Sequence, residues 1–364
     1  MDRGRIVKEL PPSADNPRNS EGSFIARKDG SILFVYSRFG GGTDADDAPA
    51  NLARLISDDG GETWHDGGII LTRDGEKADN IMSVSLLRMA DGRIAMFYVL
   101  RRGFDDSKAH FRLSDDEGET WGEERYCAAP ALGTYDTNND RVIRTSRGRI
   151  IVPACYFRTR THISIDFKDI STLDFKAQTI YFYSDDEGKN WQESNIMSIP
   201  VGWSRSGLQE PGVIELSPGH LYGWARTDAY CQYEMFSIDD GATWSVPQPS
   251  RFRSPVSPMT IRRDPTTGQL LAFWNPLPEM PGLPGLKEGY GLARTPYVCA
   301  VSHDNGGTWS EPMVIEDDPL TAYCYTAVHF VGKEMLIAYC AGSQQEGYLN
   351  RLRIRKMPVP TIGK

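Results

Sequence analysis

The stretch SDDGGETW, residues 57–64, carries the pattern on which the fold of this chain depends. The same frame, S-x-D-x-G-x-[TN]-W, returns as SDDEGETW (114–121), SDDEGKNW (184–191), SIDDGATW (237–244) and SHDNGGTW (302–309). The copies follow one another at intervals of roughly 60 residues, and such a period is typical of a repeat architecture. Ser, Asp and Gly are turn residues, so each copy predicts a tight, structural turn with a Trp that packs between sheets.

Short β-rich runs precede every copy of the turn. Before the first copy, for example, SFIARKDGSILFVYSRF (23–39) contains two apolar runs joined by a glycine turn, and NLARLIS (51–57) is a third run. A sixth hairpin, TAVHFVGKEMLIAYCAG (326–342), lacks the phrase. Six four-stranded units arranged radially predict an all-β, six-bladed β-propeller that occupies residues 1–364 as one domain. The N-terminal segment GRIVKEL (4–10) is expected to complete the last blade.

The composition is that of a globular protein with 40% apolar and 24% charged residues. The net charge of −9 gives no field that would favour nucleic acid. No apolar run reaches the 18 or so residues that a membrane span needs, so we expect neither nucleic acid nor membrane as a partner. The oligomeric state is left open.

The six cysteines form no C-x-x-C pair, which favours free thiols over a disulfide framework or a zinc site. We therefore expect no metal and no cofactor. The N-terminus lacks the apolar segment of a secretory signal. A cytoplasmic location is expected if the chain is full length, and a periplasmic or secreted one if a signal peptide was removed.

The antiparallel order of the strands decides which face of the propeller to search. One face of the propeller carries the start of the first strand of each blade, the end of the second and the start of the third. The repeated turn, between the third and fourth strands, lies on the opposite face. Polar residues gather at these positions: Ser20, Glu21, Asn139, Asp140, Gln209, Glu210 and Tyr325; Arg38, Arg101, Arg226 and Asn275; Asp44, Asp46, Asp47 and Arg294. Several arginines on one face indicate an anionic ligand, because guanidinium pairs bidentately with carboxylate.

The five phrases resemble the Asp-box repeats of the six-bladed sialidase (neuraminidase) superfamily, and the resemblance covers nearly the whole chain. LQEPGVIELSPGHLYGWARTD (208–228) is similar to the sialidase segment that carries a Glu and then an Arg. The resemblance implies that Glu210 polarises the nucleophile and that Arg226 binds the substrate carboxylate. LLAFWNP followed by LARTPYVCAVS implies a second carboxylate-binding arginine, Arg294.

YCYTAVHF (323–330) resembles the segment with the nucleophilic tyrosine, which implies Tyr325, with Tyr323 as the alternative. SRFGGGTDADDAPANL (37–52) resembles the loop of the first blade that carries an arginine and the acid/base aspartate. Arg38 is then similar to the arginine near the substrate's 4-hydroxyl. Asp47 or Asp46 would be the acid/base, with Asp44 in the same polar loop.

The chain departs from the family at the first blade. Sialidases open this blade with F-R-I-P, whose arginine completes an arginine triad, whereas NPRNSEGSF (16–24) places Glu21 near that position. Either Arg18 reaches in from slightly earlier, or the triad is incomplete. The segment NNDR (138–141), which contains Asn139, either lines the pocket or braces a turn. The Pro/Gly-rich loop at 275–291 is either a rim of the site or an inert excursion.

The resemblance implies a hydrolase, an exo-α-sialidase-like glycosidase that releases terminal sialic acid from glycans with retention. A tyrosine nucleophile suits a substrate whose anomeric carbon already bears a carboxylate, and it sets sialidases apart from two-carboxylate glycosidases. Two alternatives stay open. One is a glycosidase or lyase that acts on another acidic sugar, a uronic or different nonulosonic acid, which Glu21 favours. The other is a propeller that binds glycan without catalysis.

Overall fold

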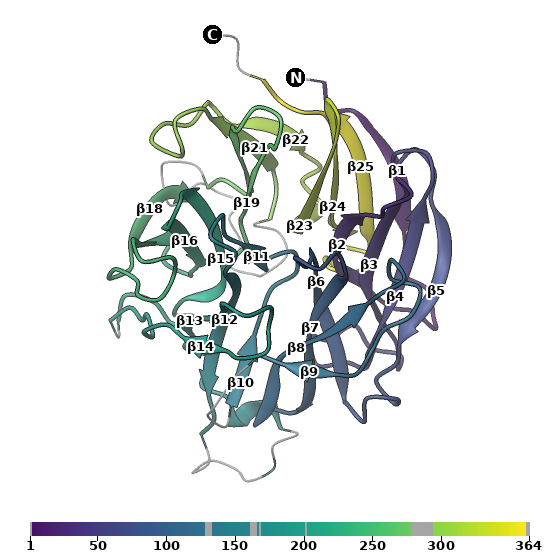
Figure 1. Cartoon of the computed structure of the whole chain (residues 1–364), viewed down its shortest axis with the longest axis horizontal. Coiled ribbons are helices and arrows are strands. Elements are labelled where there is room, and N and C mark those ends of the chain that lie inside the picture. Colours follow the sequence, from purple (N-terminus) through teal and green to yellow (C-terminus); the bar gives the residue numbers. More distant parts are fainter. Residues whose placement is uncertain are drawn as a thin grey trace.

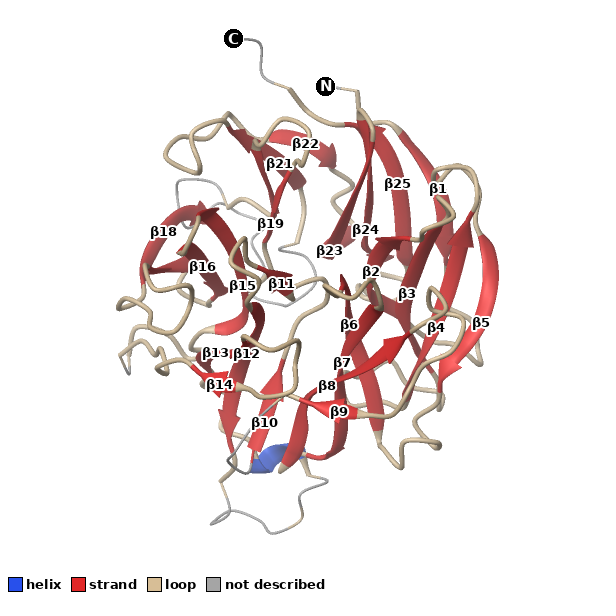
Figure 2. Cartoon of the chain, in the orientation of Figure 1, coloured by secondary structure: helices blue, strands red, loops and turns tan. Residues whose placement is uncertain are grey.

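The computed structural model of the chain describes residues 2–127, 133–160, 166, 169–200, 202–277 and 294–361. Groups of strands surround a common centre in chain order (Figure 1). Among the described residues the only helical turn is the 3₁₀ segment η1 (Ile170–Thr172), drawn in blue in Figure 2. No helix in the described part of the chain has the length and apolar character to cross a membrane.

Four blades are separate four-stranded antiparallel sheets. Blade 1 consists of β2 (Asn19–Ala26), β3 (Ile32–Phe39), β4 (Ala50–Ser57) and β5 (His65–Leu71). Blade 4 consists of β15 (Gln209–Ser217), β16 (His220–Arg226), β17 (Cys231–Ser237) and β18 (Gln248–Arg253). Blade 5 consists of β19 (Thr260–Arg263), β20 (Leu270–Trp274), β21 (Tyr297–Ser302) and β22 (Met313–Glu316). Blade 6 consists of β23 (Thr321–Val331), β24 (Glu334–Ser343), β25 (Leu352–Pro358) and the N-terminal β1 (Arg5–Leu10), which pairs antiparallel with β25.

Blades 2 and 3 share one nine-stranded sheet. Blade 2 contributes β6 (Asn80–Arg88), β7 (Ile94–Gly103), β8 (Asp106–Ser114) and β9 (Arg125–Tyr126). Blade 3 contributes β10 (Gly133–Asp136), β11 (Ile143–Arg144), β12 (Ile150–Arg158), β13 (Gln178–Ser184) and β14 (Gln192–Glu193). The two blades join because β10 pairs parallel with β8 and antiparallel with β12. The predicted six-bladed propeller is thus confirmed, with a link between two blades that the sequence did not indicate.

A separate apolar core fills each of the six contacts between neighbouring blades. The Trp of each repeated turn belongs to these cores, as expected. Trp121 packs in the core of blades 1 and 2, and Trp191 packs against Phe97 and Phe111 of blade 2. Trp244 stacks on Tyr181 of blade 3 at a centroid distance of 4.1 Å. Each turn therefore fixes its own blade to the preceding one.

The innermost strands of blades 1, 2, 4 and 6 carry a β-bulge at the same place. The bulged residue has a positive φ in each strand: 54° at Glu21, 62° at Ser83, 46° at Glu210 and 60° at Tyr325. This backbone region is unfavourable for residues other than glycine, and bulges recur beside functional sites because they re-aim a side chain. All four side chains line one cavity.

Candidate active site

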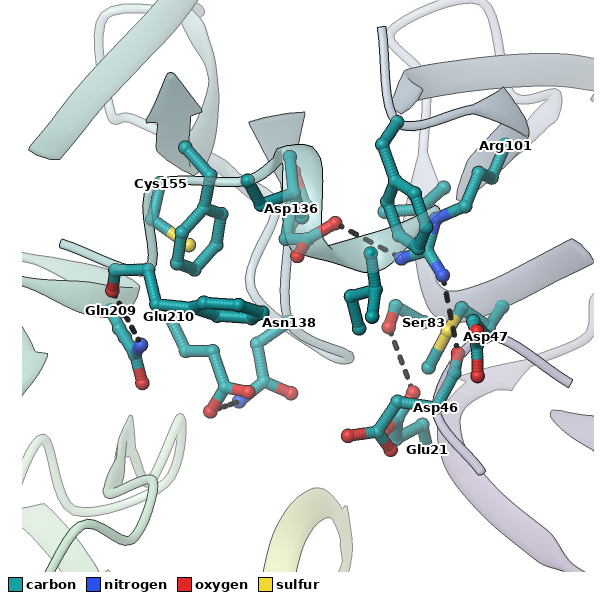
Figure 3. A pocket seen from close by; sticks show the side chains of 18 of the residues that line it. Glu21, Asp46, Asp47, Ser83, Arg101, Asp136, Asn138, Cys155, Gln209 and Glu210 are labelled. Atoms are coloured by element: carbon teal, nitrogen blue, oxygen red, sulfur yellow. Dashed lines mark hydrogen bonds and ion pairs between the residues drawn. The ribbon is translucent and has the colours of Figure 1, made fainter. Parts of the chain in front are cut away.

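The cavity lies on the face that the strand order predicts, away from the repeated turns. In blade 4, β16 ends toward the cavity at Arg226, whereas Leu221, near its other end, pairs with Ser237 at the start of a repeated turn. Side chains from blades 1, 2, 3, 4 and 6 line it. Glu21 and Asp46 lie together on one side, and Glu210 and Asn138 lie together on another (Figure 3).

Tyr325 and Glu210 form a direct pair in the cavity. The Tyr325 hydroxyl donates to Glu210 Oε1 at 3.2 Å. Burial raises the pKa of the Tyr325 phenol well above its ordinary value, the Glu210 charge adds to this, and Arg226 and Arg294 oppose it. The Tyr325 phenol is therefore neutral at rest and donates its hydrogen bond to Glu210. That arrangement leaves Glu210 able to accept the phenolic proton when the oxygen reacts.

Two further groups hold the second oxygen of Glu210. Arg226 Nη1 lies 3.1 Å from Oε2, and Asn138 Nδ2 donates to the same oxygen at 3.3 Å. Arg226 in turn donates from Nε to Gln209 Oε1 at 3.1 Å. These contacts fix the carboxylate so that its other oxygen faces the tyrosine.

Arg294 lies next to the ring of Tyr325. Its guanidinium carbon lies 5.7 Å from the centroid of the Tyr325 ring, and its side chain is buried. Nη1 donates to the Cys324 sulfur at 3.0 Å and Nη2 to the Val256 carbonyl at 3.2 Å. The two arginines that the sequence singled out in blades 4 and 5 thus converge on the predicted nucleophile.

Arg18 is held by carboxylates on the other side of the cavity. It is 1% exposed and donates from Nη1 to Asp46 Oδ1 at 2.6 Å and from Nη2 to Glu21 Oε1 at 3.1 Å. The Ser83 hydroxyl donates to the second oxygen of Glu21 at 2.8 Å. Arg18 therefore contacts two carboxyl groups of the cavity lining without being part of the lining, and its guanidinium is occupied by Glu21 and Asp46.

The two carboxyl groups that share Arg18 respond to it differently. Burial raises the pKa of Glu21 to about 7, against the lowering effect of Arg18. Desolvation acts to raise the pKa of Asp46 as well, but Arg18, helped by Arg226 and Arg294, brings it below its ordinary value. The Asp46 side chain is 71% exposed at the rim, so solvent as well as Arg18 stabilises its charge. Near neutral pH, Asp46 is ionised and Glu21 is half-protonated.

The structure adds an ion pair that the sequence reasoning missed. Arg101 Nη2 lies 3.6 Å from Asp136 Oδ1, and Arg101 Nη1 donates to the Asp46 carbonyl at 3.3 Å (Figure 3). Burial raises the pKa of Asp136, although Arg101 opposes this. Asp136 and the lining residue Asn138 come from β10 and the segment after it, the part of blade 3 that joins blade 2.

An apolar wall completes the cavity. The side chains belong to the loop around η1 and to the ends of β7 and β12, and they are Val99, Phe104, Phe157, Ile170, Leu173 and Phe175. β7 and β12 are buried on both faces, so no alternation in the sequence indicates which of their side chains face the cavity, and the loop residues carry no signal either. The site therefore offers one apolar side next to charged ones, which suits a ligand with both characters.

Several predicted residues lie outside this lining, among them the buried Arg18 and Arg294, which contact lining side chains. Arg38 is half-buried at the end of β3, and its charge acts on Asp15, whose pKa the Ser13 hydroxyl chiefly lowers. Asn139 donates to the carbonyls of Gly22 and Tyr325 and so braces the inner strands, while its neighbour lines the cavity.

Asp44 and Asp47 have different places in the loop of blade 1. Asp44 accepts from Asn350 Nδ2 at 2.8 Å, outside the cavity lining, whereas Asp47 is exposed and lines the cavity. Most of the predicted rim loop at 275–291 lies outside the described residues.

The fold and the site define a class of protein: an Asp-box propeller with a tyrosine–glutamate pair in an axial cavity that has charged and apolar sides. Residues 15–346 match the family model described as "BNR repeat-like domain". The chain belongs to this family.

Two curated relatives are distant sialidases. The chain is 25% identical over 156 residues to the anhydrosialidase of Macrobdella decora, which covers 40% of this chain and 17% of the relative. It is 24% identical over 177 residues to Sialidase-3 of Mus musculus, which covers 43% of this chain and 40% of the relative. The matched region thus spans less than half the length of either relative.

Solved structures agree over almost the whole chain. A Dyadobacter fermentans protein of unknown function superposes with a TM-score of 0.71 at 17% identity, covering 98% of this chain and 99% of that one. The NanB sialidase of Streptococcus pneumoniae superposes with a TM-score of 0.72 at 12% identity, covering 98% and 71%. At these identities the likeness establishes the sialidase-type propeller fold and no more.

Proposed function

We propose that this chain is a retaining glycoside hydrolase that cleaves terminal sialic acid, or a closely related acidic sugar, from a glycoconjugate. The observation that carries the proposal is the hydrogen bond from the Tyr325 hydroxyl to Glu210, flanked by Arg226 and Arg294. Binding of a glycan does not need a buried phenol paired with a carboxylate. The distant sialidase relatives support the same activity.

Tyr325 would attack the anomeric carbon. A sialoside carries a carboxylate on that carbon, so a neutral nucleophile avoids the repulsion that Asp or Glu would meet. Glu210 accepts the phenolic proton as the new carbon–oxygen bond forms and the bond to the leaving oxygen breaks. Water then cleaves the glycosyl–tyrosine, and two displacements at one carbon give retention. Arg226, with Arg294 beside it, balances the substrate carboxylate as positive charge develops on the ring.

Of the two aspartates at the rim, Asp47 suits the acid/base role better. That residue must carry a proton at the start of the reaction, and Arg18 holds Asp46 as a carboxylate at 2.6 Å. Asp47 follows directly and lines the same cavity. Asp46 would then orient the loop through Arg18, and Asp47 would protonate the leaving oxygen.

The activity is tested by release of 4-methylumbelliferone from its α-N-acetylneuraminic acid conjugate. We expect Tyr325→Phe to lower kcat by at least about 10³-fold, because the nucleophile is lost. Tyr323→Phe is the matched variant. Tyr323 is 1% exposed in the core of blades 5 and 6. Full activity of Tyr325→Phe with loss in Tyr323→Phe would reverse the assignment. No turnover by the wild-type protein would remove the sialidase proposal and direct the assay to uronic and other nonulosonic acid glycosides.

The acid/base assignment is tested by changing the leaving group. 4-Methylumbelliferone leaves with little help, whereas the lactose of 3′-sialyllactose needs a proton. Asp47→Asn should therefore lose far more activity on sialyllactose than on the fluorogenic substrate. Asp46→Asn should lower both rates by similar factors. The opposite pattern would assign the acid/base role to Asp46.

A further inference from the structure

Glu21 lies in the cavity at a position equivalent to those of Glu210 and Tyr325. It sits on the bulge of β2 with a φ of 54°, the position that Glu210 and Tyr325 hold in blades 4 and 6. Its side chain is 3% exposed and lines the cavity. Three equivalent bulges thus place two carboxyl groups and the nucleophile around one space.

Negative charge exceeds positive charge around Glu21. Arg18 is the cation in contact with it, and the same guanidinium also serves Asp46. The Ser83 hydroxyl donates to its other oxygen, and Glu210 faces it from blade 4. Tyr325 of blade 6 adds a phenol that also senses the Glu21 charge. Arg18 contacts both carboxylates, whereas Arg226 and Arg294 act on Asp46 from farther away, so no cation among the described contacts serves Glu21 alone.

An acidic sugar bound against Tyr325 would bring one more carboxylate into this cavity. If Glu21 stayed ionised, it would repel that group in a water-poor space, where charges interact strongly. If Glu21 were neutral, its O–H could donate to the incoming carboxylate. Arg18 would at the same time keep its bond to Asp46 and direct its second nitrogen toward the ligand.

We propose that Glu21 meets the substrate carboxylate as a neutral carboxylic acid and donates a hydrogen bond to it, so that binding takes up one proton from solution. This inference rests on the proposed function, because it assumes a ligand that carries a carboxylate. Glu21 then determines specificity: it selects an anionic ligand by holding a proton rather than by carrying a positive charge. No covalent bond changes in this step.

The acid–base properties of the site agree with this role. Burial, with the Asp46 and Glu210 charges, raises the pKa of Glu21 to about 7 despite Arg18. A further anion at hydrogen-bond distance shifts the balance more toward the neutral form. Affinity for an acidic sugar should therefore fall as pH rises above about 7, approaching a tenfold loss per pH unit.

The test is calorimetric titration of the wild-type protein with 2-deoxy-2,3-didehydro-N-acetylneuraminic acid. Runs at pH 8 in phosphate and in Tris, which differ in ionisation enthalpy, count the protons taken up. We expect nearly one proton per ligand at pH 8 and nearly none at pH 5.5. Glu21→Gln supplies a permanently neutral donor of similar shape. It should bind without proton uptake, and its affinity should vary little between pH 5.5 and 8.

Asp136→Asn is the control, because Asp136 is the other carboxyl group of the cavity whose pKa burial raises. Loss of proton uptake in Asp136→Asn but not in Glu21→Gln would overturn the inference. Binding by wild type with no proton uptake would also overturn it, while the proposed function would stand. Failure of the wild-type protein to bind the acidic sugar at any pH would contradict the proposed function and the inference together. The wild-type proton count decides the matter even if Glu21→Gln does not fold.

Discussion

The carboxylates of the repeated turns and those of the cavity differ in where their hydrogen-bond and ion-pair partners lie in the sequence. Asp116, in the second repeat, accepts from the Ser114 hydroxyl at 2.8 Å and from the Thr120 amide and hydroxyl at 2.8 and 2.6 Å. All of its partners lie within a few residues. The Thr120 hydroxyl chiefly lowers the pKa of Asp116 to about 2.

The cavity carboxylates combine near partners, such as Arg18 three residues before Glu21, with partners from other blades. Glu210 of blade 4 contacts Tyr325 of blade 6 and Asn138 of blade 3, and Glu21 of blade 1 accepts from Ser83 of blade 2. The contacts with Asn138 and Ser83 need neighbouring blades to pack together, and the contact between Glu210 and Tyr325 joins blades 4 and 6, which are not neighbours. The turns are thus local structures that build the fold, whereas the cavity is a product of the completed fold.

This difference predicts that a change in the cavity affects activity and a change in a turn affects stability. Glu210→Gln tests the first half and should have the largest effect. The amide keeps the shape of the side chain but cannot take the phenolic proton. We expect kcat to fall by about 10²–10⁴-fold. The measurement is turnover of the fluorogenic sialoside per folded protein, with folding checked by thermal unfolding. A kcat within tenfold of wild type would contradict the proton-acceptor role.

The local structures are also the part that the sequence predicts well. Five copies of one phrase indicate the blades, and the antiparallel order of strands then places Glu210, Arg226, Arg294 and Tyr325 on one face without any structural information. These features can be predicted because they depend on neighbours along the chain or on the direction of the strands.

The contacts between residues distant in sequence could not be predicted from the sequence. No pattern indicates that β10 bridges two blades, so Asp136 was missed. Asn138 belongs to the segment NNDR (138–141), which the sequence did offer as a possible part of the pocket. The sequence does not determine where the Arg18 side chain lies, because its partners Glu21 and Asp46 lie in a bulge and a loop.

The sequence did contain one signal for the bulges, the glycines Gly22 and Gly212 within strands. The structure explains them, because a Cβ on Gly22 would lie 2.2 Å from Phe34 and a Cβ on Gly212 would lie 2.2 Å from Trp224. Glycines in otherwise regular strands mark bulges, and these two closely follow Glu21 and Glu210.

The two groups of carboxylates should also respond to pH with opposite signs. The folded-state pKa of Glu21, about 7, lies above its ordinary value of 4.5, so the folded protein binds more protons than the unfolded chain between these pH values. Glu21 therefore lowers the free energy of unfolding as pH rises from 4.5 to 7, by up to about 3 kcal/mol. Asp116 has a depressed pKa, so its contribution is present above pH 4 and is lost as pH falls toward 2.

Urea unfolding at pH 4.5, 6 and 8 measures the Glu21 contribution. Glu21→Gln cannot ionise, so its stability relative to wild type should improve steadily across this range. Arg18 keeps its bond to Asp46 in the variant, which limits the cost of the change. A difference between variant and wild type that is the same at all three pH values would show that Glu21 does not titrate in this window.

The smallest effect is expected in a repeated turn. Asp239→Ala removes the acceptor for the Thr243 amide at 2.8 Å, the Thr243 hydroxyl at 2.6 Å and the Ser237 hydroxyl at 2.8 Å. Water can replace part of these bonds because the turn is exposed, so we expect a loss of about 1 kcal/mol in the free energy of unfolding. Ile238→Ala, at an 80% exposed side chain of the same turn, should leave stability unchanged.

Turnover in Asp239→Ala should equal that of wild type, because the turn lies at the other end of β16 and β17 from the cavity. Blade 4 makes this a demanding test, since it carries both the turn and Glu210. A loss of kcat with normal folding would mean that the turn helps to hold the bulge of β15 in its left-handed conformation. The separation between a local scaffold and a non-local site would then fail in a blade that contributes to both.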